Sequence, residues 1–215
     1  MDPIETTVAA VEEVGHNAVA VNLNTPEGFD AEPGQFVKLS ATIDGEIESR
    51  FYTVSSRNTE DTFKFTIRYD PDEGGAFSEY LLGIETGDAV TITGPFGDQY
   101  YQGEPRAVVL AGGPGVGPAV AIAERAAAED NDAAVVYRDD DPIHEDRLAA
   151  LASDGVDVFV LGGAESLTDA VGTAVTTEPG EQVFVYGFAD FLEDAEAAID
   201  DAGGDPGAAK TENFG

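Results

Sequence analysis

The chain of 215 residues contains no cysteine. Disulfides, cysteine-ligated iron–sulfur clusters and thiol nucleophiles are therefore excluded within this chain. Apolar runs are also short, and none approaches the roughly 20 residues that a membrane-spanning helix needs. Residues 1–5 lack the basic start and the apolar stretch of a signal peptide. We expect a soluble, cytoplasmic protein without a membrane span.

Basic residues are scarce: ten Lys and Arg stand against 43 Asp and Glu, for a net charge of −33. Without a basic patch, nucleic-acid binding is not expected. The hydrophobic content of 42% argues against a disordered acidic chain. We interpret the charge as that of a folded protein from a halophilic, high-salt cytoplasm, where the Debye length is about 3 Å at ~1 M salt. Basic residues in Gly-rich or aromatic segments then stand out, as Arg50, Arg68 and Arg138 do.

The first half of the chain is predicted to consist of β-strands. Short alternating or continuous apolar runs bounded by Gly and Pro predict strands at residues 7–11, 18–23, 35–40, 50–55, 62–69 and 89–93. One helix is predicted at about residues 76–82. Short strands at this spacing favour a closed antiparallel barrel.

The second half shows the alternation of a parallel sheet. Strands are predicted at residues 107–111, 133–137, 156–161 and 182–186, and helices between them at residues 118–129, 144–153, 167–176 and 190–202. This alternation favours a parallel sheet with helices on both faces. We place the boundary near Gly103-Glu104-Pro105, which gives domains at residues 1–104 and 105–215.

Residues 112–117, Gly-Gly-Pro-Gly-Val-Gly, place four glycines between a predicted strand and a predicted helix. Glycines let the backbone approach a pyrophosphate closely, and the helix N-terminus supplies free N–H groups. The segment departs from the full G-x-G-x-x-G pattern because Pro118 stands at the third glycine position. A tight structural turn that binds nothing is the alternative, but the strand–turn–helix setting favours a nucleotide site.

Residues 137–141, Tyr-Arg-Asp-Asp-Asp, follow about twenty residues later at the end of the next predicted strand. In a dinucleotide-binding domain this position faces the adenosine ribose. Arg138 suits a 2′-phosphate or stacking on adenine, whereas the aspartates suit a 2′-hydroxyl and would repel a phosphate. Ordinary acidic surface is an equal alternative for the aspartates. The pattern leans towards NADH without deciding between NADH and NADPH.

Two segments of the first half are weaker candidates. Residues 50–53, Arg-Phe-Tyr-Thr, place Arg50 and Tyr52 on one face of a regular strand, where they suit a phosphate and an aromatic group. Plain barrel surface is the alternative. Residues 74–78, Gly-Gly-Ala-Phe-Ser, open the predicted helix, and a Gly-rich turn at a helix N-terminus suits an anion. Ser78 offers a hydroxyl donor there, or it only starts the helix.

Taken together, these segments resemble the ferredoxin–NADP reductase superfamily of flavoproteins. Residues 50–53 match its Arg-x-Tyr-Ser/Thr flavin motif and residues 75–78 its Gly-x-x-Ser/Thr phosphate motif. Residues 94–97 match its Gly-Pro-x-Gly, residues 113–118 its nucleotide loop and residues 212–215 its Glu-x-Phe-Gly segment. The five matches follow the family's order along nearly the whole chain.

The resemblance implies roles for these residues. Arg50 holds the flavin phosphate, Tyr52 packs against the flavin, and Thr53 offers its hydroxyl near flavin N5, as the catalytic residue. Arg68 and Tyr69 fall where the family's flavin-contacting strand residues lie. The flavin implied is FAD, with FMN as the alternative, and the co-substrate is NAD(P)H. The residues expected to bind cofactors are Arg50, Phe51, Tyr52, Thr53, Arg68, Tyr69, Gly74, Gly75, Ala76, Phe77, Ser78, Gly113, Gly115, Val116, Pro118 and Arg138.

Three departures from the family concern the second half. Pro114 replaces the usual Thr of the nucleotide loop, residues 186–190 replace a Cys-Gly-Pro segment, and the region between residues 137 and 183 is trimmed. They alter the nucleotide site more than the flavin site. His16 and His144 are expected at the surface, and no spacing indicates a metal site.

We therefore expect an NAD(P)H-dependent flavin oxidoreductase that passes electrons to an acceptor such as ferredoxin. One alternative is an electron-transfer subunit of a larger complex, which an exposed apolar patch would favour. Another is a free-flavin reductase, which uses flavin as a substrate.

Overall fold

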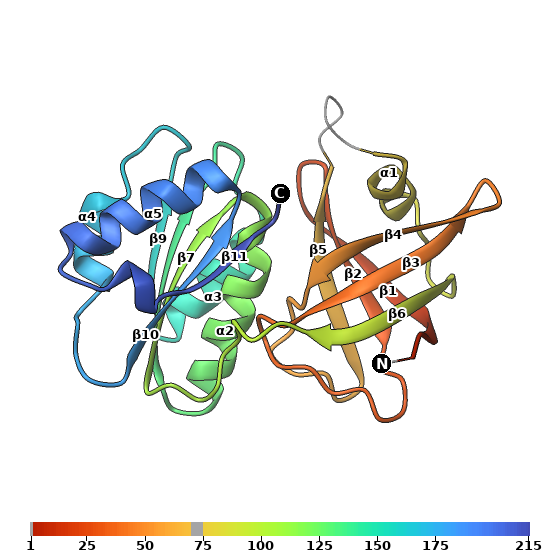
Figure 1. Ribbon diagram of the computed structural model, residues 1–215, viewed down its shortest axis with the longest axis horizontal. Coiled ribbons are helices and arrows are strands. Elements are labelled where there is room, and N and C mark those ends of the chain that lie inside the picture. Colours follow the sequence, from red (N-terminus) through yellow and green to blue (C-terminus); the bar gives the residue numbers. More distant parts are fainter. Residues whose placement is uncertain (1, 70–74) are drawn as a thin grey trace.

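The chain forms two sheets of different kinds, one in each half (Figure 1). The computed structural model describes residues 2–69 and 75–215. The first half is a six-stranded antiparallel sheet, and the second is a five-stranded parallel sheet with helices on both faces. The predicted fold class is confirmed.

The six strands of the first half curl into a barrel. They are β1 (Ile4–Gly15), β2 (Ala18–Asn24), β3 (Phe36–Ile43), β4 (Glu46–Thr53), β5 (Thr62–Arg68) and β6 (Ala89–Phe96). The order across the sheet is β4-β3-β6-β1-β2-β5. An isolated bridge between Val54 and Phe65 joins the two edges just after β4 ends. The helix α1 (Ala76–Leu82) buries Phe77 and Leu81 against this barrel.

The β3–β4 hairpin is longer than predicted. Pattern reasoning places strands at residues 35–40 and 50–55, whereas pairing runs from Phe36 opposite Thr53 to Ile43 opposite Glu46. The turn between them is Asp44-Gly45, and both residues have positive φ, of 51° and 86°. Asp-Gly is a preferred sequence of such two-residue turns. The turn was therefore predictable from the sequence, although not from the apolar periodicity alone.

The parallel sheet has the order β11-β10-β7-β8-β9. Its strands are β7 (Arg106–Gly112), β8 (Asp132–Arg138), β9 (Asp157–Leu161), β10 (Glu181–Gly187) and β11 (Lys210–Asn213). Its helices are α2 (Val116–Ala128), α3 (Glu145–Ser153), α4 (Thr168–Ala174) and α5 (Ala189–Asp201), with 3-10 turns η1 (Gly113–Gly115) and η2 (Pro206–Ala208). The linker from β6 to β7 contains the predicted boundary at residues 103–105.

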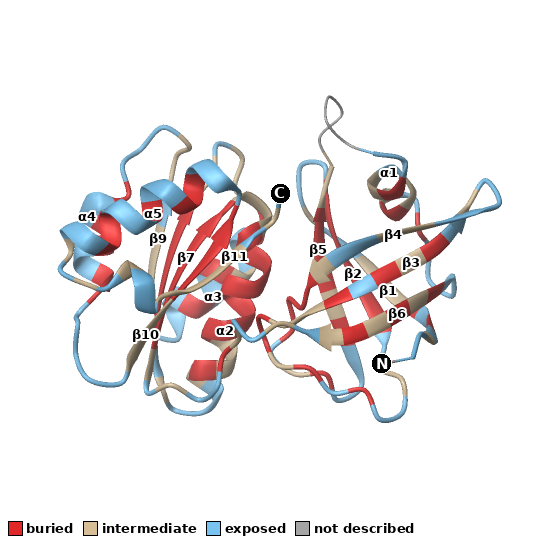
Figure 2. Cartoon of the chain, viewed as in Figure 1, coloured by how far each residue is buried: buried red, intermediate tan, exposed pale blue. Residues whose placement is uncertain are grey.

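The central strand β7 shows why both faces of this sheet are covered. On one face, Ala107, Val109 and Ala111 pack with α2 and α3. On the other face, Val108 and Leu110 pack with α4 and α5. Successive side chains of a strand point to opposite faces, so a continuous apolar run must be buried on both. Figure 2 shows β7 between the two helix layers, and it is buried from Ala107 to Gly112.

Strand β11 was not predicted as a strand. Its residues, Lys210 to Asn213, are polar and show no apolar alternation. They pair in parallel with β10, from Phe184 opposite Lys210 to Gly187 opposite Asn213. This pairing brings Glu212 back to the barrel, where it contacts Thr53. Among the described helices, none is both long and apolar enough to cross a membrane.

We expect the free energy of unfolding to rise with salt because acidic residues greatly outnumber basic ones. Seven of the ten Lys and Arg side chains form ion pairs within the described part of the chain, so most carboxylates have no such partner there. Raising KCl from ~0.1 M to ~2 M should screen their repulsion and raise the melting temperature by roughly 2–4 °C or more. Thermal unfolding followed by circular dichroism, with sucrose as the uncharged control, measures this. A melting temperature that falls with salt would show that the ion pairs outweigh the repulsion.

Candidate functional site

Two adjoining pockets lie along the seam between the barrel and the α/β half. The first, here called the barrel pocket, has a volume of about 400 Å³. The second, the loop pocket, has a volume of about 620 Å³. Pro114 of the glycine loop and Phe188 line both pockets, so molecules bound in the two would meet at these residues.

The end of β4 supplies one wall of the barrel pocket, with Arg50, Phe51, Tyr52 and Thr53 all lining it. Arg50 is exposed, and its Nη1 donates to the backbone oxygen of Ser49 at 2.8 Å. A Cβ on Gly75, at the start of α1, would lie 3.8 Å from Arg50 Nη2. The tertiary structure therefore brings together the two candidate segments of the first half.

Tyr52 makes a second contact between β4 and α1, in addition to that of Arg50 with Gly75. Its ring stacks on Phe77 with centroids 6.3 Å apart. Burial raises the pKa of Tyr52, against a smaller lowering by a hydrogen bond with Ser78 and by the charge of Arg50. The side chain of Phe77 is fully buried in the barrel core. A ligand at this segment could therefore contact only the backbone of Phe77.

Ala76 and Gly75 are both exposed at the start of α1, beside the guanidinium of Arg50. Gly74, also expected to bind a cofactor, lies outside the described residues. The first two described residues of the candidate phosphate segment are therefore accessible, and Gly75 lies next to a cation.

Thr53 is held by the other half of the chain. Its Oγ1 donates to Glu212 Oε1 at 3.0 Å, and both residues line the barrel pocket. Burial raises the pKa of Glu212 to about 7, and the Thr53 hydrogen bond lowers it in part. A carboxyl group that titrates near neutral pH thus touches the predicted catalytic hydroxyl. The sequence predicts no role for Glu212, which appears only in the segment at residues 212–215 that resembles the Glu-x-Phe-Gly of the family.

The glycine loop presses its backbone against both halves of the molecule. A Cβ on Gly115 would lie 2.2 Å from the backbone oxygen of Tyr186 in β10. A Cβ on Gly117 would lie 2.4 Å from the hydroxyl oxygens of both Ser55 and Thr66 in the barrel. A Cβ on Gly112 would lie 2.5 Å from the ring of Phe191. Only glycine permits these approaches, so three of the four glycines serve packing.

The predicted loop residues fall into different places. Gly113 has a φ of 57° with open space around it and lines the loop pocket. Pro118 lines the barrel pocket. Gly115 and Val116 are buried and line neither pocket, so they shape the loop from behind.

Arg68 and Tyr69 line the loop pocket and not the barrel pocket. The guanidinium of Arg68 pairs with Asp139, and its Nη2 donates to the backbone oxygen of Asp141 at 3.3 Å. Arg68 thus links β5 to the segment after β8. The role that the resemblance implies, a flavin contact, stays a prediction, and the observed contacts of Arg68 are with the α/β half.

Arg138 also lines the loop pocket, but its charge is already engaged. Its Nη2 donates to Asp194 Oδ2 at 2.8 Å, and its guanidinium lies 5.2 Å above the ring of Phe191. Asp139 and Asp140 line the same pocket, and Asp140 Oδ1 accepts from the Gly163 N–H at 2.9 Å. Carboxylates therefore outweigh free positive charge on this wall.

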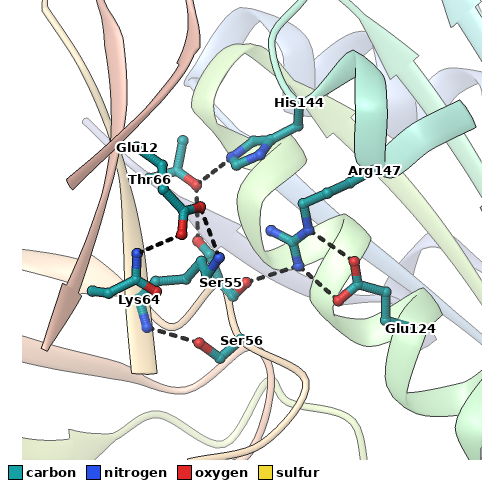
Figure 3. A network of polar contacts seen from close by, with 9 residues as sticks. Glu12, Ser55, Ser56, Lys64, Thr66, Glu124, His144 and Arg147 are labelled. Carbon is teal, nitrogen blue, oxygen red and sulfur yellow. Dashed lines mark hydrogen bonds and ion pairs between the residues drawn. The ribbon is translucent and has the colours of Figure 1, made fainter. Parts of the chain in front are cut away.

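The expectation of a surface position for His144 was wrong. Its exposed fraction is 4%, and it lies between the two halves with its Nε2 2.8 Å from Thr66 Oγ1 (Figure 3). Burial lowers the pKa of His144 to about 3, with the charges of Arg147 and Lys64 adding to this. Sequence reasoning missed it because a contact between residues 78 positions apart leaves no local pattern.

Comparison with known proteins agrees with this architecture. Residues 5–101, less than half of the chain, match the family described as "Oxidoreductase FAD-binding domain". The FAD/NAD-binding domain of a nitric oxide dioxygenase from Vibrio cholerae O1 biovar El Tor has a TM-score of 0.87 at 21% identity, covering 100% of both chains. A ferredoxin NADP+ reductase from Neisseria gonorrhoeae, solved with FAD and NADP, has a TM-score of 0.81 at 18% identity, also covering 100% of both chains.

The chain has the ferredoxin–NADP reductase-like fold. Its residues 5–101 are similar to the oxidoreductase FAD-binding domain. Among curated relatives, the probable electron transfer subunit of dihydroorotate dehydrogenase B from Methanopyrus kandleri is 32% identical over 123 residues. That match covers 57% of this chain and 44% of that protein. The chain spans less than half the length of the first curated relatives that it matches. Within the described residues, no group of three or more His, Asp or Glu side chains is arranged to hold a metal ion.

We expect Glu212→Gln to change the pH dependence of stability in the flavin-free protein. The pKa of Glu212 is about 7 in the folded state against 4.5 for the free group, so the native state binds more protons between these values. The contribution of Glu212 to the free energy of unfolding is therefore lost as pH rises through this window. The variant should gain roughly 1–3 kcal/mol on the wild type between pH ~5 and pH ~8.

Urea unfolding at several pH values measures this gain. Glu193→Gln, at an exposed position on α5, is the matched control. Equal pH profiles for Glu212→Gln and the wild type would contradict the raised pKa of Glu212.

Proposed function

We propose that this chain is a flavin-dependent oxidoreductase that takes electrons from NAD(P)H and passes them to a further acceptor. The observation that carries the proposal is the shared wall of the two pockets: Pro114 and Phe188 line both. A flavin in the barrel pocket and a nicotinamide nucleotide in the loop pocket would have their reactive rings in contact there. The similarity of residues 5–101 to an FAD-binding domain supports FAD as the flavin.

The residues of the barrel pocket fit a flavin nucleotide. Arg50 supplies a cation for a phosphate beside the exposed start of α1. Phe51 and Tyr52 supply aromatic surface, and Thr53 supplies a hydroxyl whose partner is Glu212. A bound flavin supplies the hydride and single-electron chemistry, while the protein supplies position and electrostatics.

The chain's own groups perform the remaining tasks. Arg50 holds the phosphate end, and Tyr52 is fixed by Ser78 and Phe77 so that it orients the ring system. Thr53 and Glu212 place an exchangeable proton at the pocket, at a carboxyl whose pKa is about 7. Pro114 and Phe188 supply apolar surface where the two pockets meet.

We further propose residues 1–104 as the flavin-binding domain and residues 105–215 as the nucleotide-binding domain. NADH is favoured over NADPH, because Arg138 is engaged by Asp194 and because Asp139 and Asp140 would repel a 2′-phosphate. The net charge of −33 supports a high-salt cytoplasm as the working environment.

The visible spectrum of the protein purified in high salt tests the proposal. We expect the absorbance of bound FAD, and its bleaching on anaerobic addition of NADH. NADPH should require a concentration at least about tenfold higher, which corresponds to about 1.4 kcal/mol of discrimination. Absence of flavin absorbance after reconstitution would refute the flavin assignment. Loss of the colour during desalting would favour the free-flavin reductase.

We expect Arg50→Ala to weaken flavin binding by at least about tenfold, because a phosphate partner is lost at unchanged fold. Arg57→Ala is the matched control, since Arg57 is an exposed arginine seven residues away that lines neither pocket. Fluorescence titration of flavin-free protein with FAD measures both affinities. Stoichiometric flavin retained by Arg50→Ala would remove Arg50 from the site.

A second candidate function is an electron-transfer subunit of a larger complex, and an exposed apolar surface favours it. Phe36, Phe51 and Phe96 form an aromatic patch with ring centroids 5.5 to 6.5 Å apart. Phe51 is 63% exposed and lines the barrel pocket, and Ile47, four residues earlier on β4, is 81% exposed. Such a patch marks a protein contact, here beside the flavin pocket. Flavin that is present but bleached by neither nucleotide would favour this candidate.

A further inference from the structure

We propose that His144 and Arg147 are positioning residues for Thr53. From the α/β half they hold residues 53–55, where β4 ends, and so fix the Thr53 hydroxyl at the pocket. The effect that we expect on electron transfer rests on the proposed function. It concerns five side chains, called the α3 network, which are Ser55, Thr66, Glu124, His144 and Arg147 (Figure 3).

A chain of hydrogen bonds runs from α3 to the backbone of Thr53. His144 Nε2 lies 2.8 Å from Thr66 Oγ1, Thr66 Oγ1 donates to Ser55 Oγ at 3.1 Å, and Ser55 Oγ donates to the Thr53 carbonyl oxygen at 3.4 Å. With Thr66 and Ser55 donating along this chain, the contact at Thr66 Oγ1 is made by an Nε2–H of His144. The neutral imidazole that burial enforces carries that proton when its Nε2 tautomer is present.

Arg147 holds the same segment by a second route. Its Nη2 donates to the Ser55 carbonyl oxygen at 3.0 Å. Its Nε and Nη2 donate to the two carboxylate oxygens of Glu124, each at 2.8 Å. Glu124 belongs to α2, the helix that follows the glycine loop. One planar guanidinium thus ties the end of β4 to the nucleotide-side helix in a fixed geometry.

The network leaves little room for adjustment. Ser55 is fully buried, and Thr66 and His144 are 8% and 4% exposed. The backbone of Gly117 packs directly on the Ser55 and Thr66 hydroxyls, where even a Cβ would lie at 2.4 Å. Both hydroxyl residues line the barrel pocket, and so does Pro118, the residue after Gly117. The hydroxyl pair therefore sets the spacing between the barrel and the start of α2.

Thr53 is consequently held from two sides by the α/β half. Glu212 accepts from its hydroxyl. Ser55 of the α3 network donates to its carbonyl oxygen, and Arg147 donates to the carbonyl oxygen of Ser55. Transfer between two bound rings depends on alignment to about 1 Å, whereas binding of each ring does not. Loosening the network should therefore slow electron transfer from the nucleotide before it weakens nucleotide binding.

The test uses a pair of substitutions at one position. Thr66→Val removes the hydroxyl at nearly constant volume, and Thr66→Ser keeps it. Thr59→Val is the matched control, because buried Thr59 accepts from the Ala31 N–H at 3.2 Å and donates to Asp30 Oδ1 at 3.3 Å, all within the barrel half. Flavin-loaded protein is mixed rapidly with NADH, and the limiting rate of bleaching is measured together with the apparent affinity for NADH.

We expect Thr66→Val to lower the limiting rate about tenfold with the apparent affinity changed less than about twofold. The transient long-wavelength absorbance of stacked nicotinamide and flavin should weaken in parallel. Thr66→Ser should restore most of the rate, and Thr59→Val should leave the rate at the wild-type value. Unchanged rate and absorbance in Thr66→Val would overturn the proposal, and so would an equal loss in Thr59→Val.

Calorimetry of the same proteins gives a readout independent of activity. We expect one heat-unfolding transition for the wild type and for Thr59→Val, and two for Thr66→Val, because the halves become less coupled. A single transition in Thr66→Val would contradict the coupling even if NADH reduced no flavin at all, so failure of the proposed function remains distinguishable. If Thr66→Val does not fold, Arg147→Lys serves instead, since it keeps the charge and removes the bidentate geometry.

Discussion

The hydrogen bonds between the α/β half and the end of β4 are the constraint on which the site depends. Thr53 donates to Glu212 from β11, and Arg147 of α3 donates to the carbonyl oxygen of Ser55. His144, the residue before α3, contacts Thr66, which donates to the Ser55 hydroxyl. The pocket around Thr53 therefore exists only while the barrel and the parallel sheet keep their observed arrangement. Buried hydrogen bonds of this kind stabilise one arrangement strongly, because a polar group left without its partner costs far more than the bond contributes.

Glycine serves the same constraint on the nucleotide side. Gly115 and Gly117 approach Tyr186 and the Ser55–Thr66 pair too closely for any side chain, while Gly113 remains in open space beside the loop pocket. One short segment thus combines packing against two neighbours with an accessible surface for a ligand. Its Pro114 faces both pockets, at the point where the two proposed ligands would meet.

Charge and apolar surface are distributed unequally over this molecule. Carboxylates dominate the composition and reach the loop pocket, where they engage Arg68 and Arg138. The aromatic patch of Phe36, Phe51 and Phe96 interrupts this charged surface beside the barrel pocket. An exposed apolar patch of this kind is typical of a protein-contact surface.

Local pattern in the sequence was sufficient for the architecture. Apolar alternation, Gly and Pro turns and the change of period near residue 104 predicted the barrel and the parallel sheet, because these signals act over a few residues. The motifs at residues 50–53 and 113–118 likewise drew attention to segments that line the two pockets. The longer β3–β4 hairpin was missed, although its Asp-Gly turn was a local signal as well.

Contacts between distant residues were decided only by the tertiary structure. Glu212 meets Thr53 across 159 positions, and His144 meets Thr66 across 78. The polar segment β11 forms a strand because it pairs with β10. His144 is buried because it lies between the two halves. The raised pKa of Glu212 and the lowered pKa of His144 follow from that burial. Burial depends on which surfaces meet, and no pattern within either segment records that.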